Sequence, residues 1–270
     1  MSIYLQTNVS SLVAEGNFNT NQAALNNSFT QLSSGYRINS AADDAGMLGV
    51  SSVLNSQVQS YAVAATNTAD ASSMVQTADG SSGQISDLLT RMRALAVEAQ
   101  NGTMNSNDVA NLGTEYTSDL NEIDRVAGDA TFNGTSLLSG TANTVNFQVG
   151  INGTTNDQIA VGFGGLDTTG LGINGSTVSD ANILTTLDSA MTTLNTARAG
   201  FGATMNRLTY ASNQIQSTST NLASAASTIQ DVDVASASAN LAREQVLAQA
   251  GASVLSQANQ MPQLALKLLQ

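Results

Sequence analysis

The longest regular pattern in the sequence lies in FGATMNRLTYASNQIQSTSTNLASAASTI, residues 201–229. Large apolar side chains stand seven residues apart there, with smaller apolar residues between them: Phe201, Leu208, Ile215, Leu222 and Ile229, with Met205, Ala211 and Ala225 as lesser partners. A heptad repeat places one apolar stripe along a helix and turns it toward another helix. The pattern therefore predicts a long helix in a coiled-coil-like seam.

A second helical stripe lies within residues 41–100, where proline is absent and alanine is plentiful. Its apolar residues recur at helical steps, as in Ile85, Leu88, Met92 and Leu95. The Asn-Gly pair at 101–102 suits a helix C-terminus. Ser106 and Asp108 then look like start signals for a further helix that ends near Gly128.

Between these helices the hydrophobic period changes from helical to alternating. In TVNFQVGI, residues 144–151, apolar and polar residues alternate, and they alternate again in 159–163 after NGTTNDQ. This pattern predicts a β-hairpin with one apolar face. Gly, Ser, Thr and Asn from about 133 to 180 favour turns. We expect a mainly α fold: an elongated bundle of long antiparallel helices with one β-hairpin region.

Composition excludes several classes of function. Eight basic residues against twenty acidic ones give a net charge of -12, which disfavours nucleic acid and anionic lipid as partners. The chain has no Cys and no His, so disulfides, thiolate chemistry and the commonest metal ligand are absent. No apolar run is long enough for a membrane span, and the N-terminus lacks the layout of a signal peptide. We expect no catalytic site, no metal and no cofactor.

Three short motifs have plain structural interpretations. Ser40 and Asp43 form a capping-box pattern, which favours a helix start over a carboxylate pair made by Asp43 and Asp44. GLGING, residues 170–175, matches the GxGxxG spacing but does not sit in a βαβ unit, so a nucleotide site is disfavoured. Three Asn-Gly-Thr triplets are shaped like glycosylation sequons, but Asn-Gly pairs are turn formers first. These triplets begin at Asn101, Asn133 and Asn152.

The C-terminal stretch ANQMPQLALKLLQ, residues 258–270, is unusually apolar for a chain end. It contains the only proline, Pro262, which we expect to interrupt helical hydrogen bonding. The large apolar residues form a cluster too small to be stable in a monomer, and they are Met261, Leu264, Leu266, Leu268 and Leu269. We therefore expect this tail to be disordered in the free protein and to become helical when neighbouring copies bury it.

Four long motifs, in order along the chain, resemble bacterial flagellin. They are LSSGYRINSAADDAG (32–46), LTRMRALAVEAQNGT (89–103), LNEIDRVAGDATFNG (120–134) and VLAQAGASVLSQANQMPQLALKLLQ (246–270). The chain departs from the family pattern after Ala45, where Gly46, Met47 and Gly49 predict a less regular helix start. It also lacks the large variable middle region of many flagellins, which implies a short form.

The resemblance implies a structural subunit that is exported through the flagellar export apparatus and assembles into the extracellular filament used for motility. Residues 1–41 and 231–270 would form a terminal helical filament-core domain, and 42–230 a helical rod domain that includes the hairpin region at about 133–180. Implied partners are further copies, the filament cap and hook-junction proteins, and a cytoplasmic export chaperone. A hook-filament junction protein stays open as the alternative. The zinc-peptidase insert of some flagellins requires an H-E-x-x-H motif, which a chain without His cannot contain.

Two sets of site residues follow from the family resemblance and the apolar tail. The self-assembly residues are Leu247, Val254, Met261, Leu264 and Leu268. The resemblance also implies a surface patch that the vertebrate Toll-like receptor for flagellin recognises. The matching residues are Arg91, Leu95 and Glu115. Leu95 also belongs to the helical stripe, so a core role competes with a receptor role at this residue.

Overall fold

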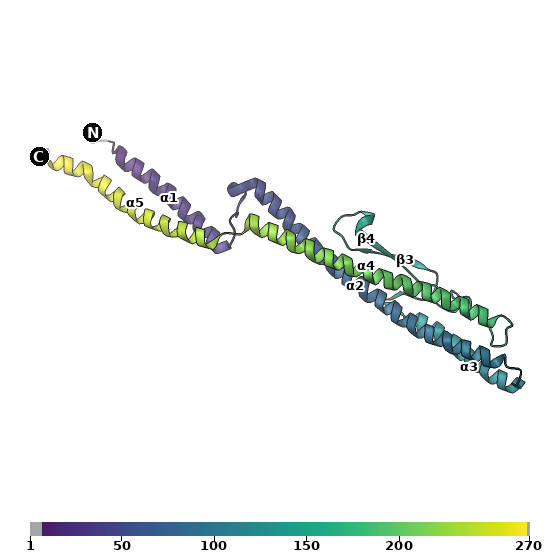
Figure 1. The fold of residues 1–270 in the computed structure, drawn as a ribbon. Coiled ribbons are helices and arrows are strands. Elements are labelled where there is room, and N and C mark those ends of the chain that lie inside the picture. The colour runs from purple at the N-terminus through teal and green to yellow at the C-terminus, as the bar shows by residue number, and fades with distance from the viewer. Residues whose placement is uncertain (1–6, 269–270) are drawn as a thin grey trace. The chain divides into compact units, whose positions relative to one another are not determined.

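A computed structural model describes residues 7–268, with side chains up to Met261, and it is mainly helical (Figure 1). The helices are α1 (Val9–Ser34), α2 (Ala41–Ala99), α3 (Ser106–Asp129), α4 (Ile183–Gln230) and α5 (Val234–Leu268). The strands are β1 (Thr131–Phe132), β2 (Thr135–Ser136), β3 (Asn143–Gln148) and β4 (Gln158–Phe163), with a 3₁₀ turn at Thr155–Asp157 before β4. The expected mainly α class with antiparallel helices and a β-hairpin region is confirmed.

Internal contacts divide the chain into two compact units. The first comprises the N-terminal residues up to Ser56 and the chain from Asn221 onward, and the second comprises Gln57–Thr220. The domain division expected from the sequence, at 41/42 and 230/231, is a functional division and stays a prediction. Within the described residues, no helix is both long and apolar enough to cross a bilayer.

The core of the second unit is built from the two predicted stripes. Ile85 and Met92 of α2 and Phe201, Leu208 and Ile215 of α4 are all buried. Farther along α4, in the first unit, Leu222 and Ile229 are half-buried and Ala226 is buried, whereas the predicted partner Ala225 is exposed. The seam therefore follows the heptad closely through residue 215 and changes phase near the end of α4.

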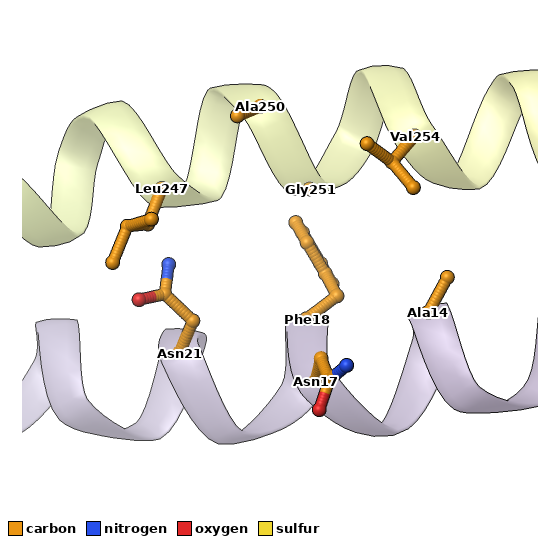
Figure 2. Close-up of a pocket in the computed structure, with 8 residues that line it drawn as sticks. All are labelled: Ala14, Asn17, Phe18, Asn21, Leu247, Ala250, Gly251 and Val254. Carbon is orange, nitrogen blue, oxygen red and sulfur yellow. The ribbon is translucent and has the colours of Figure 1, made fainter.

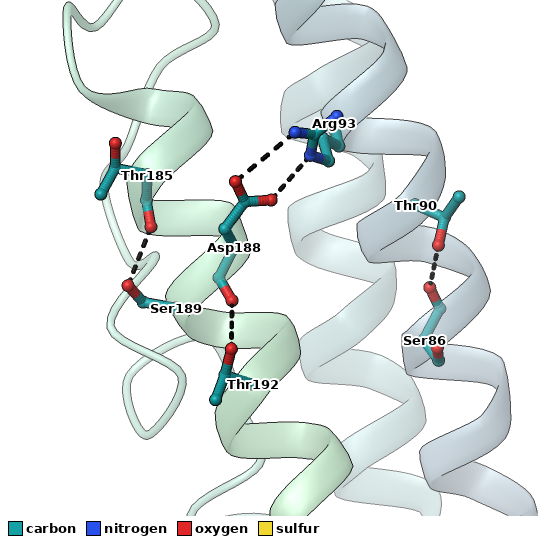
Figure 3. A network of polar contacts seen from close by, with 7 residues as sticks. All are labelled: Ser86, Thr90, Arg93, Thr185, Asp188, Ser189 and Thr192. Atoms are coloured by element: carbon teal, nitrogen blue, oxygen red, sulfur yellow. Dashed lines mark hydrogen bonds and ion pairs between the residues drawn. The ribbon is translucent and has the colours of Figure 1, made fainter.

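Ion pairs fix the pairing of α2 with α4 in the second unit. The Arg93 guanidinium donates to both carboxylate oxygens of Asp188, at 2.7 and 3.4 Å (Figure 3). Arg198 donates to Asp79 at 3.0 Å. Each ion pair joins one residue of α2 to one residue of α4. The two ion pairs therefore help to set which residues of these antiparallel helices lie opposite each other.

Exposed Ser and Thr hydroxyls bond back to the helix backbone four residues earlier. In Figure 3, Thr192 donates to the carbonyl oxygen of Asp188 at 2.8 Å, and Thr90 donates to that of Ser86 at 2.9 Å. These bonds satisfy hydroxyls that would otherwise compete with the helix for backbone groups. They explain how helices so rich in Ser and Thr stay regular.

The predicted β-hairpin is confirmed with its apolar face toward the helices. β3 and β4 are antiparallel, with Val145 opposite Val161 and Phe147 opposite Ile159. Val161 and Ile159 are buried. The ring of Phe163 stacks on that of Phe201 with 5.8 Å between centroids, which anchors the hairpin to α4.

A second, smaller hairpin joins β1 to β2 through the Asn133–Gly134 turn. Both turn residues have positive φ, 48° and 77°, and they lie between the paired residues Phe132 and Thr135. This is the two-residue turn that Asn-Gly favours. The sequence predicted the turn at Asn133 but not the strands on either side of it.

Each carboxylate of the Asp43–Asp44 pair caps the start of α2. Asp43 accepts from the backbone N–H groups of Asn39 and Ser40 and from the Ser40 hydroxyl, and these bonds lower the pKa of Asp43. Asp44 has non-helical dihedrals and accepts from the N–H of Met47 at 2.9 Å, so it caps a second helical start after a kink. The capping interpretation is confirmed, whereas the more flexible start expected from Gly46 and Gly49 stays a prediction, because the kink lies at Asp44 before them.

The glycines of the GLGING loop have backbone roles. A Cβ at Gly170 would lie 2.2 Å from the carbonyl oxygen of Gly165, and Gly172 and Gly175 have φ values of +72° and +73°. Left-handed φ and close backbone approach each require glycine. The spacing of these glycines is therefore explained by the turns of this loop.

Two short connections between helices lie next to each other in the first unit. Residues 35–40 join α1 to α2, and 231–233 join α4 to α5. The connections form an antiparallel bridge, in which the Arg37 N–H donates to the Gln230 carbonyl at 2.7 Å and the Val232 N–H donates to the Gly35 carbonyl at 3.0 Å. The Arg37 guanidinium also donates to the Ile229 carbonyl at 2.7 Å, which caps the end of α4.

Candidate assembly surface

Side chains cap the starts of both α1 and α5 in the first unit, and a glycine closes the end of α1. The Asn8 side chain accepts from the Ser11 N–H at the start of α1, and Gly35 closes that helix with a left-handed φ of 75°. At the start of α5, the Asp233 carboxylate accepts from the N–H groups of Ala235 and Ser236. These caps satisfy backbone groups that helix ends leave open.

Polar bonds between α1 and α5 set their antiparallel pairing. Asn8 donates to the Ala258 carbonyl at 2.7 Å, Ser11 to the Asn259 side chain at 2.7 Å, and Asn21 to the Glu244 carbonyl at 3.0 Å. Figure 1 shows the two helices side by side, with the N-terminal end of α1 near the C-terminal end of α5. A residue early in α1 therefore faces a residue late in α5.

The facing side chains of this pair are mostly small or polar. Apart from Asn240, the least exposed positions of α5 recur at steps of three and four and are Ala237, Leu241, Glu244, Ala248, Gly251, Leu255 and Ala258. Opposite them in α1, the series is Ser11, Ala14, Phe18, Asn21, Leu25, Ser28 and Leu32. The ring of Phe18 lies against Gly251, where an added Cβ would come within 3.3 Å of it. The seam has coiled-coil spacing but contains few large apolar contacts.

Further large apolar side chains lie on the outside of the pair. On α5, Leu247 is 51% exposed, Val254 54% and Met261 62%. Other exposed apolar residues of the two helices are Val9, Leu12, Val13, Phe29, Val234 and Val246. A helix that packs only against its own chain turns its apolar residues inward. This pair also carries apolar residues on its outer surface, which is typical of a surface buried in an assembly.

A groove of about 340 Å³ runs along one face of the pair (Figure 2). Apolar residues make up most of its lining, which comprises Ala14, Asn17, Phe18, Asn21, Leu247, Ala250, Gly251 and Val254. A second hollow shares Ala14, Asn17 and Val254 and extends the groove past Val13 to Val9. Over the part of the pair that the structure describes, no charged side chain lines either hollow.

Glu244 is the charged exception within the seam. It is 9% exposed, and its Oε2 atom has no hydrogen-bond partner among the described residues. The α1 sequence contains one charged residue, Glu15, so α1 supplies no base for this carboxylate. A buried unpaired charge weakens the packing around it. The α1–α5 pair is therefore a weak pair when nothing else covers it.

The structure places the predicted assembly residues on the outer surface as far as they are described. Leu247 and Val254 line the groove, and Met261 is exposed on the same helix. The side chains of Leu264 and Leu268 lie outside the described residues. Pro262 does not end the helix, because α5 continues to Leu268. Proline removes one helical N–H, and here the chain accommodates that loss within the helix.

The predicted receptor residues lie in the second unit and differ in exposure. Arg91 of α2 forms an ion pair with Glu115 of α3, and its Nε lies 3.5 Å from Asp119. The hydrogen bond to Glu115 raises the pKa of Arg91. Burial raises the pKa of Asp119, against the opposing effect of Arg91. Leu95 is buried in the core, so the structure brings Arg91 and Glu115 together at the surface with Leu95 behind them.

Sequence reasoning missed the seam residues Phe18, Asn21, Glu244 and Gly251. For Glu244 and Gly251 the sequence signal is the spacing of three and four residues within 237–258. This spacing is hard to recognise because most residues at those positions are small or polar. Among the described residues, no group of three or more acidic side chains is placed to hold a metal ion.

Two family models match the chain at its two ends. The bacterial flagellin N-terminal helical region matches residues 5–143, and the bacterial flagellin C-terminal helical region matches 184–269. Together they include both helices of the α1–α5 pair.

Similar proteins match over nearly the whole chain. The flagellar filament 30.7 kDa core protein of Treponema maltophilum is 33% identical over 97% of this chain and 98% of its own length. The flagellin of Bacillus subtilis is also 33% identical, again over 97% and 98%. A crystal structure of Bacillus cereus flagellin is 35% identical, with a TM-score of 0.49, over 60% of this chain and 94% of that one. The chain belongs to the bacterial flagellin family and is a structural, non-enzymatic subunit of the flagellar filament.

Proposed function

We propose that the α1–α5 pair is the part of this filament subunit that joins one copy to the next. The exposed apolar residues of this pair support the proposal, because Leu247, Val254 and Met261 lie outside a seam that is otherwise mostly small or polar. Neighbouring copies with the same uncharged surface can cover these residues. The family forms a polymer of one kind of chain, so the covering partner is a further copy.

The filament core would be built from this pair, and the remainder of the chain would form the rod around it. The proposed division is 1–41 with 231–270 for the core and 42–230 for the rod. Leu264 and Leu268 continue the apolar sequence past Met261 and would extend the contact with neighbouring copies.

Export through the flagellar apparatus would precede assembly. The absence of Cys means that no disulfide has to be reduced or reformed, and a single Pro leaves few slow isomerisation steps for refolding outside the cell. Before export, a cytoplasmic chaperone would cover the exposed apolar residues of α5. The filament cap and hook-junction proteins are the proposed partners at the two ends of the polymer.

A receptor interaction is proposed for the Arg91–Glu115 surface. Both side chains are accessible, and their charges are held in a fixed arrangement by the ion pair between α2 and α3. Leu95 is buried, so it would support this surface indirectly by holding α2 in place through core packing. The partner would be the vertebrate Toll-like receptor for flagellin.

Deletion of residues 258–270 tests the assembly proposal. The deletion removes the Asn8–Ala258 and Ser11–Asn259 bonds and the exposed Met261, but no buried residue of the second unit. We expect no filaments by sedimentation and electron microscopy. Thermal unfolding of the second unit, followed by circular dichroism, should be unchanged. Normal polymerisation of the truncated chain would show that the tail is not an assembly element.

A further inference from the structure

Four Asn-Gly pairs occur in the sequence, at 101–102, 133–134, 152–153 and 174–175, and all of these residues are exposed. We propose that Asn101 is the first site of spontaneous deamidation in the folded protein. The product would be aspartate and isoaspartate at the C-terminal end of α2. This inference does not depend on the proposed assembly surface.

The reaction needs only water in addition to the chain. The backbone nitrogen of Gly102 loses its proton and attacks Cγ of Asn101, which forms a C–N bond and closes a five-membered succinimide. The side-chain nitrogen leaves as ammonia. Water then opens the ring at either carbonyl, giving aspartate or isoaspartate. Glycine favours the attack because it has no side chain to hinder the approach of its nitrogen.

The local geometry at Asn101 favours this attack. Its Oδ1 accepts from the Thr103 backbone N–H at 3.3 Å, so a donor already faces the atom on which negative charge develops as the ring forms. The attacking group is also available, because the Gly102 N–H makes no hydrogen bond within the described residues. Both residues lie in the turn between α2 and α3.

The turn around Asn133 opposes ring closure. Asn133 and Gly134 have φ values of 48° and 77°, and the β1–β2 pairing of Phe132 with Thr135 holds this conformation. Rotation of the Asn133 backbone toward its own side chain would break that turn. We therefore expect Asn133 to react most slowly.

The other two pairs make backbone hydrogen bonds as Asn101 does, whose N–H donates to the Glu98 carbonyl and whose carbonyl accepts from the Met104 N–H, both at 3.0 Å. The Asn174 N–H donates to the Thr168 carbonyl at 3.1 Å, and its side-chain nitrogen donates to Thr169 at 3.4 Å. The Asn152 carbonyl accepts from the Gln148 side chain at 2.8 Å. Neither side-chain oxygen accepts a backbone N–H from the described part of the chain, so both lack the arrangement found at Asn101.

Deamidation at Asn101 would weaken the junction between α2 and α3. A new carboxylate would lie just beyond Ala99, at the negative end of the α2 dipole. Isoaspartate would also add one carbon to the backbone directly before the capping box formed by Asn105 and Asp108. The first change acts on the last turn of α2, and the second acts on the connection that leads into α3.

Peptide mapping by mass spectrometry tests the order of reaction. The full-length chain is incubated folded at mildly alkaline pH, and conversion of each Asn-Gly pair is followed over time. We expect Asn101 to convert several-fold faster than Asn133 and Asn174. In denaturant, where the hydrogen bonds are absent, the four rates should become similar.

Gly102→Ala is the matched variant. A Cβ at Gly102 would meet no atom within 4 Å, and φ at this position is not left-handed, so the variant should fold normally. It should slow conversion at Asn101 several-fold and leave the other pairs unchanged. Equal or faster conversion at another pair in the folded chain, an unaltered Asn101, or an order of rates that persists in denaturant would each overturn the proposal.

Discussion

Replacement of Leu247, Val254 and Met261 by Ser should raise the concentration needed for polymerisation without unfolding the monomer. Each side chain has about half of its surface exposed, with exposed fractions of 51%, 54% and 62%. Full burial of such a side chain contributes about 1.5–3 kcal/mol, so covering the exposed half contributes ~0.75–1.5 kcal/mol. For three residues the loss is ~2–5 kcal/mol per subunit added, which corresponds to a rise in critical concentration of roughly 30-fold to 1,000-fold or more.

The assay is sedimentation of seeded polymerisation over a range of protein concentrations. Val63→Ser is the matched control, because Val63 is 61% exposed but belongs to the second unit. Circular dichroism of each variant checks that the monomer keeps its helical content. An unchanged critical concentration for the triple variant, with a folded monomer, would refute the assignment of these residues to the contact between copies.

Three further outcomes follow from the second unit. Arg91→Ala should weaken receptor activation in a reporter-cell assay, since it breaks the ion pair with Glu115, and a full response from the variant would contradict the proposed surface. Leu208→Ala should lower the free energy of unfolding by about 2–5 kcal/mol, because Leu208 is buried in the α2–α4 seam; a change below about 1 kcal/mol in denaturant titration would be inconsistent with that packing. Burial raises the pKa of Asp119 above 3.8, so the folded state binds its proton more tightly than the unfolded state does. The stability gained from that proton is present below the unfolded pKa and is lost as pH rises through the folded pKa. Asp119→Asn should remove this loss, and denaturant titrations at a series of pH values would show it as a smaller fall in stability between acid and neutral pH.

The helices and the large hairpin could be predicted because one physical signal dominates each of them. Phe201, Leu208 and Ile215 are buried where a heptad requires, and Val161 faces Val145 where alternation requires. In each case apolar residues mark the face that packs inside the same chain. The spacing of the apolar residues therefore predicts both the type of secondary structure and the face that is buried.

For the α1–α5 pair, the sequence could not show which residues pack in the seam and which lie outside it, because the conspicuous apolar residues are not the ones that form the seam. Leu247 and Val254 are the conspicuous apolar residues of α5, yet the seam is formed by neighbours such as Glu244 and Gly251. A sequence pattern identifies apolar residues but cannot tell whether they pack within a chain or between chains. The Phe18–Gly251 contact depends on a register that only the folded pair reveals.

The receptor surface and the helix start illustrate two other limits. Arg91 and Glu115 are 24 residues apart in sequence, and their ion pair exists because α2 and α3 fold back on each other. The sequence predicts a helix start near Asp44, but a second cap after a kink requires dihedral angles that residue types alone do not specify.

The bridge between residues 35–40 and 231–233 has a mechanical consequence. Residues 35–40 and 231–233 are the two backbone connections between the α1–α5 pair and the rest of the chain. A single connection could swivel about its bonds. Two connections tied together by the Arg37–Gln230 and Val232–Gly35 hydrogen bonds resist swivelling, although they can still bend across the line of the bridge. A bridge of this kind restrains twisting of the two connections about each other more than it restrains bending.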